Sequence, residues 1–205
     1  MKKKVKPSKP STGGKSPSIL AGKKKKIFAI LLLLFSILIL LSIISYSRFD
    51  RANLSNSFSD LSTSNPKADT RNWLGIIGAY VSDFFIRSTL GISSIIFPVL
   101  LLGFGLSLLK LISYRRLINT SNFLLIAGLL LSTVLGVFRT HFQVFSDNYE
   151  LSGSVGDYLG LSLSHLLGGV GSLILLFAAA IILFVIAFDI KLENIFHFIE
   201  SLFIS

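Results

Sequence analysis

The residues Gly14, Lys15 and Ser16 match the last three letters of a phosphate-binding loop, which is the nearest approach to nucleotide chemistry in this sequence. The complete loop requires a glycine at position 9, where the sequence has Lys9. It also requires a helix directly after the loop, and Pro17 stands where that helix would begin. We therefore predict no nucleotide site in this segment.

The sequence also lacks the residue patterns of metal binding and of nucleophilic catalysis. His141, His165 and His197 lie far apart, without the spacing or the carboxylate partners of a metal site. The sequence has no cysteine, which excludes disulfides and thiolate ligands, and no serine stands in the G-x-S-x-G pattern of a hydrolase. We predict no catalytic, cofactor-binding or metal-binding residue, and we do not expect this chain to be an enzyme.

Long apolar segments make up most of the chain, and they must position any functional residues. Hydrophobic residues make up 52% of the 205 residues, and several apolar runs reach the roughly 20 residues that cross a bilayer. The pattern predicts an all-α membrane protein with four transmembrane helices. The predicted spans are residues 27–46, 91–112, 122–138 and 168–188, with Tyr114–Ser121 as the short loop between the second and the third.

The interiors of these spans differ in detail. Pro98 is expected to kink the second span, as prolines do in membrane helices. Along the third span, Gly128, Ser132 and Gly136 recur every four residues. Such a stripe of small residues lets another helix approach closely, so we predict that the third span lies centrally in the bundle.

Ionisable residues stand at the edges of the spans and not inside them, as Lys110, Arg139 and Asp189 illustrate. Proton relays, ion pathways and coupled transporters almost always need ionisable groups within the membrane. The pattern therefore disfavours a small polytopic channel or carrier subunit. That class stays open as an alternative, together with a stand-alone structural envelope protein.

The basic charge of the chain is concentrated at its N-terminus. Residues 1–26 hold ten lysines and no acid, whereas the remainder carries ten basic and ten acidic residues. This segment has too little apolar surface to fold, so we predict a disordered cytoplasmic tail. Lys23, Lys24, Lys25 and Lys26 directly precede the first span, which places the N-terminus in the cytoplasm and also fits contact with anionic lipid.

Because the number of predicted spans is even, the C-terminus should lie on the same side of the membrane as the N-terminus, in the cytoplasm. Residues 189–205 place apolar residues on one helical face and polar residues on the other. We predict an amphipathic helix on the cytoplasmic surface. The predicted organisation is thus a tail at 1–26, a transmembrane domain at 27–188 and this helix at 189–205, with both termini in the cytoplasm.

Two segments that lead into spans match one another. Six identities fall in a 22-residue window when residues 75–96 are written over residues 153–174: Gly75 and Gly153, Gly78 and Gly156, Tyr80 and Tyr158, Gly91 and Gly169, Ser94 and Ser172, Ile96 and Ile174. We interpret this match as an internal repeat. It predicts a 2+2 parallel arrangement, with amphipathic interfacial helices on the outer face before spans 2 and 4.

The first lead-in segment, Asn72–Ser88, carries an aromatic face. On a continuous helix, Trp73, Ile77, Tyr80 and Phe84 would share one side, with Asp83 and Arg87 paired on another. Tryptophan and tyrosine suit the headgroup region of a membrane, so we expect the helix to lie on the outer leaflet or to dip into it. A plain extension of the second span is the alternative.

The arrangement as a whole resembles the N-terminal membrane domain of the FtsK/SpoIIIE DNA translocase family. The resemblance is carried by the basic tail, the four spans, the stretch NWLGIIGAYVSDFFIRSTLG before a second span with Pro98, and the glycine-rich unit Gly153–Gly171. It extends over nearly all of Ile27–Phe188. The linker, the Walker A and B motor and the DNA-reading module of the family have no counterpart in these 205 residues.

The resemblance implies a bacterial inner-membrane protein at the division septum, which anchors an ATP-driven DNA motor and takes part in assembling the division machinery. It implies contacts with the lipid bilayer and with other cell-division membrane proteins, and self-association as a hexamer through the motor. ATP, magnesium and DNA would bind only to the absent motor. If partners bind on the outer side of the membrane, the expected surface is the face of Trp73, Ile77, Tyr80 and Phe84 together with the two outer loops, Ser47–Arg71 and Arg139–Gly153. Contact of this face with lipid alone is the alternative.

Overall fold

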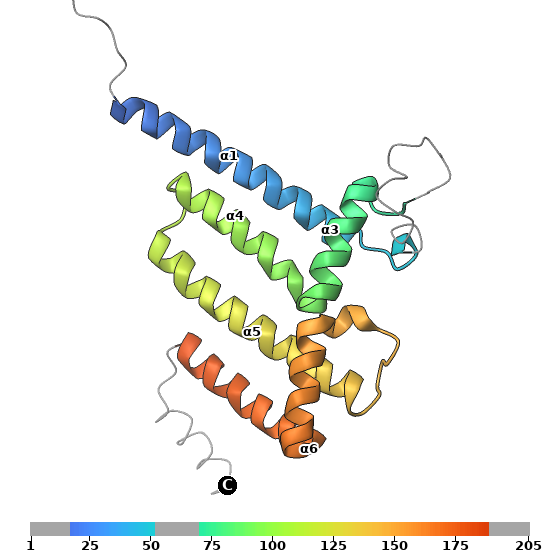
Figure 1. Ribbon diagram of the computed structural model, residues 1–205. Coiled ribbons are helices and arrows are strands. Elements are labelled where there is room, and N and C mark those ends of the chain that lie inside the picture. The colour runs from blue at the N-terminus through green and yellow to red at the C-terminus, as the bar shows by residue number, and fades with distance from the viewer. Residues whose placement is uncertain (1–16, 52–69, 189–205) are drawn as a thin grey trace, which may run out of the picture.

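The computed structural model describes residues 17–51 and 70–188, and these residues form helices joined by short connections (Figure 1). The predicted tail before residue 17, residues 52–69 of the outer loop predicted at Ser47–Arg71 and the predicted amphipathic helix at 189–205 lie outside the described residues. The elements are α1 (Pro17–Ile44), α3 (Gly75–Ser88), the 3-10 helix η2 (Gly91–Ile95), α4 (Ile96–Leu108), α5 (Tyr114–Thr140) and α6 (Tyr149–Ala187).

Four helical segments are long and apolar enough to cross a membrane: Lys23–Ile44, Gly91–Leu108, Tyr114–Thr140 and Tyr149–Ala187. The described part of the chain contains no strand. The predicted class, an all-α membrane protein with four transmembrane helices, is confirmed. In a bilayer the exposed apolar side chains of these helices face lipid, which explains why so few large hydrophobic residues are buried within the chain.

The four spans lie side by side in chain order, as a row (Figure 1). Small residues bring α1 and α4 together: Ala29 and Ser36 are fully buried on α1, and Gly105 of α4 faces Ala29 and Leu33. The Ser36 hydroxyl donates a hydrogen bond to the carbonyl oxygen of Pro98 at 2.5 Å. The third span, α5, occupies an inner position in the row between α4 and α6.

Several predicted boundaries are wrong. Helix α1 begins at Pro17, so residues 17–26 are helical and not part of a disordered tail. A proline is tolerated in the first turn of a helix, because its missing N–H has no helical partner there. The predicted loop Tyr114–Ser121 is instead the beginning of α5, and the connection to α4 is limited to residues 109–113. Polar residues there extend the helix beyond the apolar span.

The backbone is irregular where the second span begins and along the first half of α6. Pro98 lies in the first turn of α4, directly after the 3-10 helix, and is not an interior kink of a longer helix. Helix α6 is interrupted twice, at Gly153 and Gly168, where the backbone is left-handed. These breaks separate residues 154–167 from the part of α6 that follows Gly168.

Candidate functional site

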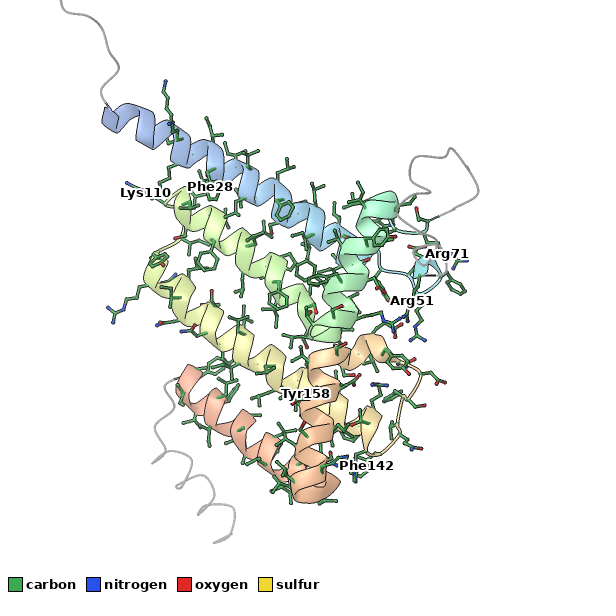
Figure 2. All side chains as sticks on the ribbon, in the orientation of Figure 1. Phe28, Arg51, Arg71, Lys110, Phe142 and Tyr158 are labelled. Atoms are coloured by element: carbon green, nitrogen blue, oxygen red, sulfur yellow. The ribbon has the colours of Figure 1, made fainter. Side chains whose placement is uncertain are left out.

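The lead-in helices form a continuous feature across one end of the spans. Figure 1 shows α3 and the first part of α6 end to end, steeply inclined to the four spans. We call these two helices, residues 75–88 and 154–167, the strap. Figure 2 shows Tyr158 on the strap and Arg51 and Arg71 at the same end of the molecule, whereas Lys110 lies at the opposite end.

Left-handed glycines mark where the strap helices and the following spans begin. Gly75, Gly91, Gly153 and Gly168 have φ values of 64°, 64°, 65° and 71°. Gly75 and Gly153 are a pair that the sequence alignment predicted. Gly91, however, corresponds in conformation to Gly168 and not to Gly169, a shift of one position. The 2+2 parallel repeat remains a prediction.

The two halves of the strap meet at Gly91 and Gly153. A Cβ atom on Gly153 would overlap the amide nitrogen of Gly91 and the carbonyl oxygen of Thr89, and one on Gly91 would overlap the Leu151 carbonyl. The Val155 amide donates a hydrogen bond to the Thr89 carbonyl oxygen at 3.1 Å. Backbone therefore packs directly on backbone at this junction, which only glycine permits.

A buried polar cluster fastens the first half of the strap to α1. The Asp50 carboxylate accepts hydrogen bonds from the Arg71 amide at 2.7 Å and from the Asn72 amide at 3.0 Å. The Asn72 side chain donates to the carbonyl oxygen of Ser42 at 2.9 Å, and the Ser42 hydroxyl donates to the carbonyl oxygen of Gly78 at 2.5 Å. Buried polar groups need such partners, so the cluster holds α3 against the end of α1.

A charged pair fastens the second half of the strap to α5. Arg139 donates from Nε to Asp157 Oδ1 at 2.7 Å and from Nη2 to Asp157 Oδ2, and the two side chains are only 13% and 18% exposed. The Arg139 guanidinium also lies over the Tyr149 ring, 4.3 Å from its centroid. The Ser152 hydroxyl donates to the same carboxylate. A bidentate pair of this kind fixes orientation as well as position.

Sequence reasoning missed this pair. It placed Arg139 at a span edge and did not select Asp157. A signal was present: Arg139 is the one basic residue between residues 117 and 190, and Asp157 is the one acidic residue between residues 151 and 188. Two isolated opposite charges beside apolar spans indicate a partnered pair, because a lone charge there would be costly.

The small-residue stripe of α5 is buried along its length. Gly128 faces Ile96 of α4, and Gly136 faces the backbone of Gly156 in the strap. The Ser132 hydroxyl donates to the Ser152 carbonyl oxygen at 2.7 Å. The stripe thus contacts α4 at one end, through Gly128, and the first part of α6 at the other, through Ser132 and Gly136.

The predicted aromatic face is only partly assembled on one helix. The left-handed Gly75 separates Trp73 from α3, so Trp73 lies in the preceding turn. Trp73, Ile77 and Phe84 are 68%, 74% and 58% exposed, whereas Tyr80 is half-buried. The exposed members of the set leave an apolar surface at this end of the molecule.

The expected pairing of Asp83 with Arg87 is wrong. The Arg87 guanidinium lies over the Tyr149 ring, 5.5 Å from its centroid, and Oδ1 of Asp83 is buried without a hydrogen-bond partner. Burial raises the pKa of Asp83, the Arg51 guanidinium lowers it and the Glu150 carboxylate raises it further. Arg87 thus contacts the first residue of α6 instead of Asp83.

A second polar cluster joins the end of α1 to the beginning of α6. Arg48 forms an ion pair with Glu150 at 2.8 Å and donates a hydrogen bond to the Asn148 side chain at 2.7 Å. The Tyr46 hydroxyl lies 3.5 Å from the Glu150 carboxylate. Burial, followed by the Glu150 charge, raises the pKa of Tyr46 above its ordinary range. Together these contacts connect the first and last elements of the row at the strap end.

The lysine flank lies at the other end of the molecule. Lys23, Lys24, Lys25 and Lys26 are exposed on α1. Among residues 17–51 and 70–188, no group of three or more histidine, cysteine or acidic residues could hold a metal ion.

Comparison with known proteins agrees with the resemblance seen in the sequence. The family described as the 4TM region of DNA translocase FtsK/SpoIIIE matches residues 22–200, a range that includes the four spans and the strap. This region is the membrane part of the family and not its motor. No curated protein and no solved structure matches the chain. The chain belongs to the family of the 4TM region of DNA translocase FtsK/SpoIIIE.

Proposed function

We propose that this chain is the membrane anchor and the division-machinery assembly domain of a septal DNA translocase, which couples chromosome segregation to cell division. The single observation that carries the proposal is the family match over residues 22–200. The four spans and the interlocked strap support it, because an anchor under load from a motor needs a rigid membrane unit. We propose that this chain has no catalytic activity of its own, and that ATP, magnesium and DNA bind to a separate motor domain.

The proposed location is the bacterial inner membrane at the division septum, with both termini in the cytoplasm. Lys23–Lys26, Arg115 and Arg116 lie at the ends of helices opposite the strap, and an excess of basic residues marks the cytoplasmic side of a membrane protein. The strap then faces the outside.

In this orientation the exposed Trp73, Ile77 and Phe84 are the proposed contact surface for other cell-division membrane proteins. Exposed aromatic and aliphatic groups beside buried polar clusters are typical of a surface that a partner covers. Self-association, as a hexamer through the motor, is the proposed assembly of the full protein.

A fluorescent fusion of this chain, expressed in a bacterium with its native division machinery, tests the proposal. We expect fluorescence at the septum, and we expect the triple variant Trp73→Ser, Ile77→Ser, Phe84→Ser to distribute evenly around the membrane while still being inserted. The matched control changes Ile174→Ser, Phe177→Ser and Ile181→Ser on the fourth span. An even distribution of the unmodified chain would contradict the assembly role.

The native polypeptide provides an independent test of the anchor role. An antibody against the outer loop Ser47–Arg71 should detect a polypeptide several times larger than 22.5 kDa in the source cells, since the proposed motor is part of the same protein. A band at 22.5 kDa would favour the stand-alone envelope protein or the channel subunit instead.

A further inference from the structure

A groove runs along the membrane-facing surface between α5 and the fourth span. Its apolar part has a volume of about 700 Å³, within the size range of small-molecule sites. The α5 side includes Phe123, Ala127 and Val134, and the α6 side includes Phe177, Ala180 and Leu183. These side chains offer no polar group to a bound molecule, so this part of the groove suits a hydrocarbon chain.

The groove becomes polar toward the beginning of α5. A second hollow, of about 570 Å³, shares Phe123 and Leu183 with the first, so the two are continuous. Asn119, Thr120 and Asn122 contribute to its lining. Amide and hydroxyl groups at this end can donate hydrogen bonds to the oxygen atoms of an ester or a phosphate.

Two arginines extend the same surface by one turn. Arg116 precedes Thr120 by four residues and Phe123 by seven, which places the three on one helical face. Arg115 likewise precedes Asn119 by four residues and Asn122 by seven, so these three also share a helical face. Both arginines are exposed, and neither takes part in an ion pair within the part of the chain that the structure describes. Lys110 lies at the same end of the molecule (Figure 2).

We infer that this groove binds an anionic glycerophospholipid, with an acyl chain along the apolar part and the headgroup phosphate near Arg115 and Arg116. The chemistry changes along the groove from hydrocarbon to hydrogen-bond donor to cation, in the order in which a phospholipid presents acyl chain, ester and phosphate. Arginine recognises phosphate by paired hydrogen bonds as well as by charge. The proposed topology assigns the site to the cytoplasmic leaflet.

This site is distinct from the lysine flank of α1. Helices α1 and α6 lie at the two edges of the row, so α4 separates the lysine flank on α1 from α5, which forms one wall of the groove (Figure 1). A hollow of about 410 Å³ also follows the lysine flank, but it is lined only by apolar side chains of α1, from Phe28 to Leu38, and it has no polar lining like Asn119 and Thr120. A lipid bound in the groove would fill the space between the third and fourth spans and hold them together.

Photo-labelling of the full chain in mild detergent tests the inference. The probe is phosphatidylglycerol with a diazirine in one acyl chain, and labelled peptides are located by mass spectrometry. We expect labelling concentrated on α5 and the fourth span, competed by unlabelled phosphatidylglycerol better than by phosphatidylcholine. A basic residue near an anionic lipid strengthens binding by about fivefold, so the double variant Arg115→Ala, Arg116→Ala should lower groove labelling by about fivefold or more.

Two matched controls make the result specific. The double variant Lys25→Ala, Lys26→Ala removes the same charge at the other edge and should leave groove labelling unchanged. Ala180→Phe fills the groove from an exposed position and should lower labelling, whereas Ala178→Phe adds the same bulk at an exposed position outside the lining and should not.

Three results would overturn the inference. Labelling spread evenly over the four spans would show ordinary annular lipid. Equal competition by phosphatidylcholine would show no preference for an anionic headgroup. A groove occupied by a second copy, detected as a cross-linked dimer that excludes the probe, would make this surface a protein interface.

Discussion

Gly91 and Gly153 lie backbone against backbone, although 61 positions separate them in the chain. Both have left-handed φ values, of 64° and 65°. Each glycine begins a helical segment, one leading into the second span and one into the second half of the strap. Their contact joins the two halves of the molecule at a point where no side chain fits.

Gly153→Ala should therefore destabilise the fold strongly. The backbone of Gly153, with φ 65° and ψ 174°, costs a residue with a Cβ roughly 1–3 kcal/mol, and overlap with the Gly91 and Thr89 backbone adds roughly 1–3 kcal/mol. The matched control is Gly75→Ala, because Gly75 has nearly the same φ, 64°, and open space around its Cβ position. Thermal unfolding in mild detergent measures both. Equal losses of stability would show that the junction has no tight contact.

The Arg139–Asp157 pair predicts a second stability difference. Asp157→Asn leaves the Arg139 guanidinium largely buried without its counter-ion, and the expected loss is about 2–3 kcal/mol after allowance for its partial exposure. The control is Glu150→Gln, because the arginine that it leaves without a counter-ion, Arg48, is 55% exposed and the change should lower stability by about 0–1 kcal/mol. Similar melting temperatures for the two variants would contradict a special role for the pair.

Asp83 predicts a dependence of stability on pH. Its pKa is raised in the folded state, mainly by burial, so the folded state favours the protonated carboxyl. The free energy of unfolding should fall as the pH rises from the ordinary value of 3.8 through the higher folded-state pKa, and no penalty should remain below 3.8.

Asp83→Asn should remove this penalty, making the variant more stable than the unmodified chain at neutral pH and not at pH 3. Unfolding of both proteins is measured across this pH range in detergent. The control is Asp147→Asn at an exposed position. A stability difference that is the same at every pH would exclude the titration of Asp83 as its cause.

Replacing Ser132, which is packed against the strap, should lower the stability of the fold. Ser132→Ala removes the hydrogen bond to the Ser152 carbonyl and should cost about 0.5–1.5 kcal/mol. Ser132→Leu also drives a larger side chain against the Gly156 backbone and should cost about 1–3 kcal/mol more. Melting of the two variants in mild detergent measures the difference. Unchanged melting of the leucine variant would argue against a buried stripe on α5.

The proposed topology predicts the accessibility of introduced cysteines. The chain has no native cysteine, so a single substitution is the only site of reaction. In intact cells, Ser62→Cys should react with a membrane-impermeant thiol reagent, and Thr120→Cys should react only after the cells are opened. The reverse pattern would place the strap in the cytoplasm and overturn the proposed orientation.

The sequence by itself determined the elements that the bilayer and the local backbone specify. Apolar runs of membrane length predicted the four spans, because the thickness of a bilayer sets a length that is visible in one chain. The glycines predicted where lead-in helices end and spans begin, since a change of direction requires a residue that accepts a left-handed backbone. Helix ends such as Pro17 and Tyr114 were harder to predict, because polar residues can continue a helix beyond the membrane.

Only the tertiary structure decided how these elements meet. Three contacts illustrate this: the Gly91–Gly153 junction, the Arg139–Asp157 pair and the burial of Ser132 under the strap. In each of them, the local sequence around one residue does not indicate which residue it contacts. A residue's periodicity shows which face of its own helix it occupies, but not which distant backbone will lie against that face. That choice depends on the combined packing of the whole row, where small residues allow close approach and buried charges require a partner.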